Sequence, residues 1–366
     1  MMTRVMMTSQ YICLCLVLIS RIVTTGSLGK RNEGMNPGLG VAHGHYGDTG
    51  PTQDSVQQGG VISPVAIPHQ ITEQKIATHS SDHADYTHDF RVLIDNPEVC
   101  KNQVFLLVFV CSSVENFKQR EAIRQTWGSI EDPTIKIIFV LGSVKGDNPR
   151  RNQITNIVKN ESFIHKDIIQ EDFIDSYKNL TIKSITWIKW TAFKCKHAKY
   201  ILKSDDDMFI NLPSLLSDLK NTVHKRFIMG NIIAGAQPSQ DKESKYFTPK
   251  TLYDKALYPK YMSGSAYVVS GDLIYDLYLA TKRTAPFWIE DIYITGLLAE
   301  KLDMQHIFNG KFGYKRRILH PCLFNYVITG HYMTPPEMIK LWWKIKHVDY
   351  PCEKTRLSHG NMDGTW

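Results

Sequence analysis

The chain has 366 residues and a formal net charge of +7 at neutral pH. Its basic residues are scattered along the sequence and form no single stripe, so the charge does not indicate a nucleic-acid-binding protein. The length suits one large folded domain with additional segments.

The first 25 residues predict entry into the secretory pathway. Residues 5–20 carry no charge, and Arg4 and Arg21 flank them. This stretch is short for a membrane-spanning helix, which needs about 20 apolar residues. Two interpretations stay open: a secretory signal cleaved near the small residues 24–26, or an uncleaved signal anchor in which Arg21 extends toward the membrane surface. Both place the rest of the chain in the secretory lumen, and we expect a cytoplasmic tail and signal anchor over residues 1–25.

Residues 26–96 are dominated by glycine, proline, glutamine, serine, threonine and histidine, without a sustained apolar period. Such a segment buries too little apolar surface to offset the entropy lost on ordering. It is therefore predicted to be a disordered lumenal stem. Its several histidines could bind a metal, but polar residues of a disordered segment are the simpler interpretation.

From residue 97 to residue 366 we expect one folded domain in which strand patterns alternate with helix patterns. This alternation predicts an α/β fold with a mostly parallel central sheet and flanking helices. In such sheets ligands bind at the carboxyl ends of the strands. Short apolar runs predict strands at residues 104–110, 135–141, 168–169 and 200–203, and helical spacing predicts helices at residues 118–127, 151–161, 180–197 and 335–345.

Three consecutive aspartates, Asp205, Asp206 and Asp207, follow the strand predicted at residues 200–203. Adjacent carboxylates repel one another, and acidic residues are disfavoured inside strands. A strand end with this charge suggests a cation site, and carboxylate oxygens suit hard divalent ions such as magnesium or manganese. Asp205 and Asp207 are two residues apart, so on an extended segment they point to the same side. The alternative is a solvated acidic turn.

Cysteine usage supports an oxidising compartment. The five cysteines beyond the N-terminal segment are dispersed, with no close pair at zinc-ligand spacing. Two N-glycosylation sequons, at positions 160 and 179, fit the same compartment. We expect two disulfides, Cys100–Cys195 and Cys322–Cys352, with Cys111 left free because it ends a core strand.

Six sequence blocks between about residues 100 and 352 resemble, in order, those of the β1,3-galactosyltransferase and β1,3-N-acetylglucosaminyltransferase family. REAIRQTWG at 120–128 resembles the RxxIRxTW motif, KSDDD at 203–207 corresponds to the DxD element, and EDIY at 290–293 resembles the EDV element. Met262 departs from the cysteine that many relatives have before Ser-Gly. The remaining blocks are FVLG at 139–142, EDFIDSYKNLT at 171–181, and YP with SGSAY between 258 and 267.

The resemblance implies a GT-A type glycosyltransferase of the Golgi membrane, with single-pass type II topology and a lumenal catalytic domain over residues 97–366. It also implies a manganese ion and a UDP-sugar donor, either UDP-galactose or UDP-N-acetylglucosamine. The transfer would be inverting and would form a β1,3 linkage to the glycan of a glycoprotein or glycolipid.

Residue roles follow from the matched motifs. Asp207 is implied as a direct metal ligand with Asp205 beside it, and Asp205 and Asp206 would contact the ribose or uracil side or metal-bound water. Two arginines and a tryptophan are expected at the nucleotide: Arg120 and Arg124, one helical turn apart with guanidinium forks that suit diphosphate oxygens, and Trp127. A surface ion pair for Arg124 and a core position for Trp127 are the alternatives.

An inverting transfer needs one base that accepts the proton of the acceptor hydroxyl. By the match to the EDV element this base is Asp291, and Glu290 would position the base or the acceptor. Without the resemblance, both carboxylates would be interpreted as an acidic first turn that stabilises a helix dipole. The acceptor pocket is expected to use the aromatic rings of Trp288, Tyr258 and Tyr261.

Two other function classes remain open from the sequence. A metal-dependent phosphate-transfer or hydrolysis enzyme would also use paired aspartates, although a glycine-rich phosphate loop is missing from the sequence. A non-catalytic lumenal glycan-binding protein would keep the fold without turnover. Release of UDP from a UDP-sugar with manganese distinguishes the transferase from both.

Overall fold

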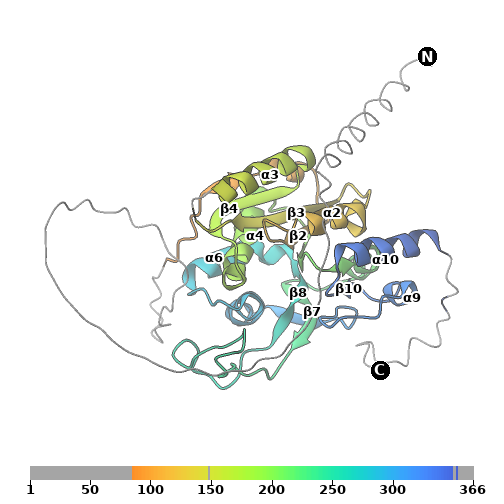
Figure 1. Ribbon diagram of the computed structural model, residues 1–366. Helices are drawn as coiled ribbons and strands as arrows, with labels where there is room; N and C mark the ends of the chain where they lie inside the picture. The colour runs from red at the N-terminus through yellow and green to blue at the C-terminus, as the bar shows by residue number, and fades with distance from the viewer. Residues whose placement is uncertain (1–84, 147–148, 349–351, 353–366) are drawn as a thin grey trace, which may run out of the picture. The chain divides into compact units, whose positions relative to one another are not determined.

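The computed structural model describes residues 85–146, 149–348 and 352 (Figure 1). In this part of the chain an eight-stranded sheet runs in the order β1-β4-β3-β2-β5-β8-β7-β9. Strand β2 pairs in parallel with β3 and β5, whereas β8 pairs antiparallel with β5 and β7. The predicted α/β fold with a mostly parallel sheet is confirmed. The strands are β1 (Val92–Ile94), β2 (Leu106–Cys111), β3 (Ile135–Ser143), β4 (Ile168–Ile174), β5 (Tyr200–Asp205), β7 (Phe227–Ile233), β8 (Tyr261–Ser270) and β9 (Gln305–Phe308).

The helices agree with the expected pattern. Each strand and helix predicted between residues 104 and 203 is present, with bounds shifted by a few residues, and so is the predicted last helix. A π-helical turn at Tyr293–Leu297 joins the two short helices at Glu290–Ile292 and Leu298–Lys301. The α-helices are α2 (Phe117–Gln125), α3 (Pro149–His165), α4 (Leu180–Lys194), α5 (Leu212–Lys220), α6 (Ile274–Arg283), α7 (Glu290–Ile292), α8 (Leu298–Lys301), α9 (Pro321–Phe324) and α10 (Pro335–His347).

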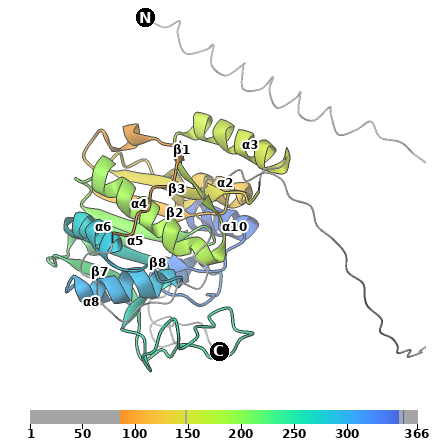
Figure 2. The same ribbon diagram turned by 90° about the vertical axis from the view of Figure 1, so that its left-hand side faces the viewer.

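Two apolar cores lie on opposite faces of the sheet. Successive side chains of a strand point to opposite faces, so Leu107 and Phe109 of β2 join one core, while Leu106 and Val108 join the other. Helices α4 and α6 pack together over the first core, and α2 and α10 pack together over the second (Figures 1 and 2). Burial on both faces explains why β2 is apolar throughout.

The sheet topology brings the acidic triplet to the carboxyl ends of two central strands. Cys111, the last residue of β2, is in register with Asp205, the last residue of β5. After the aspartates the chain enters β6 (Phe209–Ile210), which pairs antiparallel with β10 (Thr329–Gly330). This small second sheet places the residues after β10 beside the acidic turn, although they are more than a hundred positions away in the sequence.

The folded part begins before the boundary expected at residue 97. Strand β1 lies within the predicted stem and pairs with β4, with Val92 opposite Glu171. Further upstream, the backbone N–H of Tyr86 donates to the carbonyl of Lys282 at 2.8 Å. The rest of the predicted stem, residues 26–84, and the predicted anchor over residues 1–25 lie outside the described residues.

The expected single-pass type II topology in the Golgi membrane is wrong for the part of the chain that the structure describes. Among these residues, no helix is both long enough and apolar enough to cross a membrane. The longest of them, α3, has 17 residues and carries several charged ones, whereas a spanning helix needs about 20 apolar residues.

Both expected disulfides are confirmed. Cys100, which precedes β2, is bonded to Cys195 at the end of α4. Cys322 of α9 is bonded to Cys352, which follows α10. Cys111 is free and buried, and burial raises the pKa of its thiol to about 12. This thiol is therefore a core residue, without the activated character of a nucleophile.

Candidate active site

The middle aspartate of the triplet faces the protein. Asp206 Oδ2 accepts hydrogen bonds from Ser112 Oγ at 2.7 Å and from Asn116 Nδ2 at 2.8 Å. Burial raises the pKa of Asp206; these hydrogen bonds act against the rise, and the neighbouring Asp205 and Asp207 add to it. Asp206 thus attaches the acidic turn to the segment after β2, and this leaves its two neighbours to face the site.

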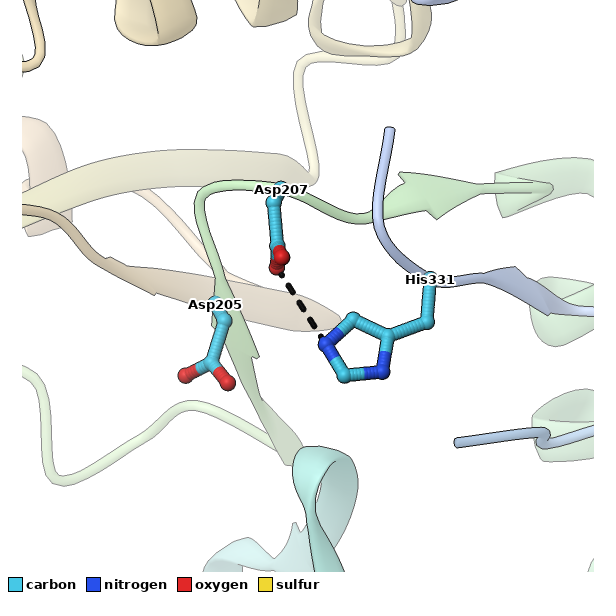
Figure 3. Close-up of side chains that lie close together, drawn as sticks. All are labelled: Asp205, Asp207 and His331. Atoms are coloured by element: carbon cyan, nitrogen blue, oxygen red, sulfur yellow. Dashed lines mark ion pairs between the residues drawn. The ribbon is translucent and has the colours of Figure 1, made fainter. Parts of the chain in front are cut away.

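Asp205, Asp207 and His331 form a cluster that could hold a metal ion (Figure 3). One ligand atom from each residue lies within 4.8 Å of the others. His331 Nε2 is 3.5 Å from Asp207 Oδ1. Two carboxylates and one imidazole suit a divalent ion such as manganese, which accepts both oxygen and nitrogen ligands. The expected pair of aspartates is therefore brought together, and a third group joins it.

The tautomer and orientation of His331 are set by its surroundings. Its Nδ1 is 2.6 Å from the carbonyl oxygen of Tyr314, so Nδ1 carries a proton and donates to this carbonyl, while Nε2 faces Asp207. The ring of Tyr332 stacks on the imidazole at a centroid distance of 3.8 Å. Burial lowers the pKa of His331, but the hydrogen bonds to Asp207 and Tyr314 outweigh burial and raise it.

Sequence reasoning missed His331. It is one of 14 histidines, and no local motif marks it. Its place depends on the pairing of β10 with β6 and on a hydrogen bond from the backbone N–H of Met333 to the carbonyl of Asp207, at 2.8 Å. His331 directly follows β10, a strand of two residues that no apolar run in the sequence predicts.

Asp291 has the environment of a base. It lies in α7 and is partly exposed. Its Oδ2 accepts from the backbone N–H of Gly264 at 3.0 Å, and its Oδ1 accepts from that of Ile292 at 2.9 Å. Burial and the negative charge of Glu290 raise the pKa of Asp291 to about 7, although Lys203 and the two backbone hydrogen bonds act in the opposite direction. A carboxylate with this pKa can accept a proton near neutral pH.

Glu290, by contrast, is buried within a polar network. Its Oε1 accepts from Ser184 Oγ and from the hydroxyl of Tyr267, each at 2.6 Å. Its Oε2 is 3.9 Å from Lys203 Nζ. With 5% of its surface exposed, Glu290 is placed to fix the start of α7 and to act on Asp291 through charge.

Lys203 joins the candidate metal site to the candidate base. Its Nζ donates to Asp205 Oδ1 at 2.6 Å and also to the carbonyl of Gly264, whose own N–H donates to Asp291. Burial lowers the pKa of Lys203, but Asp205 and Glu290 outweigh burial and raise it. The lysine therefore remains charged and connects the end of β5 to β8 and α7.

The arginines of the motif at residues 120–128, which were expected to bind the nucleotide, contact other residues of the protein. Arg120 is fully buried, and it pairs with Glu161 and donates to Ser112 Oγ, the same hydroxyl that binds Asp206. Arg124 pairs with Glu161 and Asp167 and lines a pocket of about 300 Å³ with residues that precede β2 and residues of β3. This pocket lies toward the amino ends of these strands, whereas the acidic triplet lies at the carboxyl end of β5.

Trp127 completes this motif as a core residue. Its ring is 1% exposed, and its Nε1 donates to the carbonyl of Met208 at 2.9 Å. A buried tryptophan whose only polar atom already has a partner has no surface left for a nucleotide. The structure thus places Arg124 in ion pairs with Glu161 and Asp167 and Trp127 in the core.

Of the expected acceptor aromatics, only one is open to a ligand. Tyr258 and Tyr261 are buried, and the hydroxyl of Tyr258 donates to Thr248 Oγ1 at 2.9 Å. Trp288 is partly exposed and packs edge-on against Tyr177, with ring centroids 6.4 Å apart.

Comparison with known proteins identifies the family. Residues 118–309 match the Galactosyltransferase family. Lactosylceramide 1,3-N-acetyl-beta-D-glucosaminyltransferase A of Danio rerio is 36% identical over 258 residues, which cover 66% of each chain. Beta-1,3-galactosyltransferase 1 of Homo sapiens is 36% identical over 262 residues, 70% of this chain and 78% of the relative. The solved galactosyltransferase LgtC is 11% identical, with a TM-score of 0.33 over 67% of this chain and 97% of its own.

The matched region contains β3 to β9, with the acidic triplet and Asp291. The resemblance noted in the sequence motifs is thereby confirmed. The chain belongs to the galactosyltransferase family.

Proposed function

We propose that this protein is an inverting hexosyltransferase that moves galactose or N-acetylglucosamine from a UDP-sugar to a glycan acceptor in β1,3 linkage. The observation that carries the proposal is the connection of the two halves of the site. Lys203 donates directly to Asp205 of the metal-type cluster, which consists of Asp205, Asp207 and His331. The same lysine is connected to Asp291 through Gly264, whose carbonyl accepts from Lys203 and whose N–H donates to Asp291. A donor held at the cluster would present its sugar toward the base.

Asp205, Asp207 and His331 are the residues that would hold the divalent ion, for which manganese is the expected metal. A bound ion would neutralise charge that develops on the departing diphosphate. The protein contributes the orientation of the three ligands. Asp206 fixes the turn from one side, and the contact between Tyr314 and His331 fixes the imidazole.

Asp291 would act as the base. The acceptor hydroxyl loses its proton to a carboxylate oxygen of Asp291 while its oxygen attacks the anomeric carbon, and the bond from that carbon to UDP breaks on the opposite side. One displacement inverts the anomeric configuration. A base with a pKa near the working pH combines a large ionised fraction with useful basicity, and the pKa of about 7 fits this requirement.

The test is product analysis with the full chain. UDP-galactose and UDP-N-acetylglucosamine are each supplied with manganese and with acceptors that end in galactose, N-acetylgalactosamine or N-acetylglucosamine. The proposal expects UDP and a β1,3-linked product with at least one combination. Release of inorganic phosphate would instead indicate a phosphohydrolase, and donor binding without UDP release would indicate a non-catalytic binding protein.

A further inference from the structure

The segment between β7 and β8, residues 234–260, is the starting point. It is a long connection in which strand-type pairing is limited to one isolated bridge, between Ser239 and Phe247. The backbone N–H of Thr248 donates to the carbonyl of Ser239 at 2.8 Å, and the hydroxyl of Tyr258 donates to the side chain of Thr248. Connections of this length are uncommon in compact domains and are often functional.

The exposed tip of this segment meets an aromatic residue from another part of the chain. Lys245 Nζ lies 4.7 Å from the ring centroid of Tyr246 and 5.5 Å from that of Tyr177, which precedes α4. Tyr177 in turn contacts Trp288, so that three distant segments contribute one ring each.

These rings are accessible and lie close to the candidate base. Tyr177 is 48% exposed and Tyr246 is 45% exposed, while Trp288 precedes Asp291 by three residues. The pKa of Tyr177 is raised by burial, by Tyr246, and by the negative charges of Asp291 and Asp205. Tyr177 contacts Trp288, which lies on the segment that leads into α7 and Asp291.

We propose that Tyr177, Tyr246 and Trp288 form the acceptor subsite, and that it receives the terminal hexopyranose ring of the acceptor. This inference rests on the proposed function and specifies where its second substrate binds. Aromatic rings offer broad apolar faces to the C–H groups of a sugar ring. The tyrosine hydroxyls and the Lys245 ammonium supply hydrogen-bond donors for sugar hydroxyls. A neutral pyranose needs this combination.

The segment that carries Tyr246 then determines acceptor choice. Tyr246 and Lys245 lie at the tip of residues 239–248, which the hydrogen bond from the backbone N–H of Thr248 to the carbonyl of Ser239 closes into a loop. Sequence changes in this tip would alter the acceptor surface without touching Asp205, Asp207 or Asp291. Donor handling and acceptor choice are thus assigned to separate parts of the chain.

Binding is measured first, because it does not depend on turnover. Saturation-transfer NMR is recorded with methyl β-galactoside, methyl α-N-acetylgalactosaminide and methyl β-N-acetylglucosaminide, in the presence of UDP and manganese. At least one glycoside should bind the wild type and lose about five- to tenfold in affinity with Tyr246→Ala and with Trp288→Ala, the loss of one aromatic face. Tyr275→Ala, at a tyrosine of α6 that is 54% exposed, is the matched control and should bind normally.

Kinetics provide the second measurement. Both subsite variants should raise the acceptor KM by the same factor, while the donor KM and the slow release of UDP without acceptor stay at the wild-type values. Equal losses toward donor and acceptor, or a normal acceptor KM, would overturn the subsite. A wild type that binds a glycoside at these rings but never releases UDP would refute the proposed function instead, so the two failures are distinguishable.

Discussion

At the residue scale, Glu290 and Asp291 are neighbours in sequence but have carboxylates in different environments. Glu290 is buried and bonded to Ser184 and Tyr267, whereas Asp291 is partly exposed and bonded to backbone N–H groups. The fixed negative charge of the first makes the second a stronger base. Neighbouring groups in different environments commonly take different roles in acid–base chemistry.

Asp291→Asn tests the base directly. The amide keeps the shape of the side chain and one acceptor oxygen but cannot take a proton. Turnover should fall by about 10²–10⁴-fold, while binding of the UDP-sugar and manganese stays nearly normal, because the proton moves only in the transition state. Steady-state kinetics and a donor titration on the same protein check this. Turnover within a few-fold of wild type would favour the helix-dipole interpretation, since asparagine caps helices about as well as aspartate.

The pH dependence follows from the raised pKa of Asp291. The base must be ionised, so kcat/KM should rise with pH and level off above about 7. For stability the sign is reversed. The folded state binds this proton more tightly than the unfolded state, so the contribution of Asp291 to stability is present at low pH and is lost as the pH rises toward 7. Melting curves of wild type and Asp291→Asn should therefore move closer together, or cross in favour of the variant, between pH 5 and pH 8; a growing wild-type advantage would contradict this reasoning.

His331→Ala tests the third member of the metal-type cluster. Mutation of a residue that only hydrogen-bonds to a metal ligand costs about 10–100-fold in metal affinity. Loss of the His331 ligand itself should therefore weaken manganese binding by at least this factor. Electron paramagnetic resonance of free manganese measures this without any turnover. His347→Ala, at an exposed histidine of α10, serves as the control. Asp207→Ala should lose still more, and normal affinity in either variant would remove that residue from the ligand set.

At the element scale, strand β8 supports the site because it has a glycine where it passes α7. A Cβ built on Gly264 would lie 3.0 Å from Asp291 Oδ2 and 3.1 Å from its Cβ. These distances are shorter than ordinary contacts. The backbone of Gly264 cannot easily shift, because its carbonyl accepts from Lys203 and its N–H donates to Asp291. The absence of a side chain at this position thus lets the strand and the helix approach closely enough to bond.

Gly264→Ala should displace Asp291 and lower turnover by tenfold or more, since a shift of about 1 Å at a catalytic group can cost about 10²-fold. Donor affinity should change much less, because Asp205 and Asp207 are on β5 and the following turn. Gly310→Ala is the matched control, as a Cβ there would meet Phe308 at 3.6 Å, an ordinary contact. Turnover and melting temperature are measured for both variants. Normal turnover in Gly264→Ala would show that the added methyl group does not displace Asp291.

At the scale of the whole molecule, the two disulfides constrain segments of different length. The Cys100–Cys195 bond closes 95 residues, which include β2, β3, β4 and α4, whereas Cys322–Cys352 closes 30 residues around α10. Chain-entropy arguments assign about 4.7 kcal/mol to the longer loop and about 3.6 kcal/mol to the shorter one. The longer bond therefore constrains the segment with β2, β3 and β4, and β2 pairs with the strand β5 that carries the acidic turn.

Removal of the bonds should follow this order. The double variant Cys100→Ala with Cys195→Ala should melt at a lower temperature than Cys322→Ala with Cys352→Ala, and both should melt below the wild type. Calorimetry on the three proteins measures it. The reverse order would show that packing strain at Cys100, or residual structure in the unfolded chain, outweighs loop entropy.

Local sequence determined much of this protein. The strands and helices from residue 104 to 203 follow from apolar runs and helical spacing, because these patterns depend on neighbours within a few positions. The acidic triplet at a strand end depends on the same short range. The family motifs added Asp291, which no periodicity could have distinguished from a helix-capping residue.

Tertiary structure alone decided which side chains meet. His331 reaches Asp207 through the pairing of β10 with β6, and Lys203 reaches Gly264 across the pairing of β5 with β8. Arg120 and Trp127 are residue types suited to a nucleotide, yet their polar atoms contact Glu161 and the carbonyl of Met208. The physical reason is that contacts between distant segments depend on register, burial and competition for hydrogen bonds, and these are properties of the packed chain that no short stretch of sequence contains.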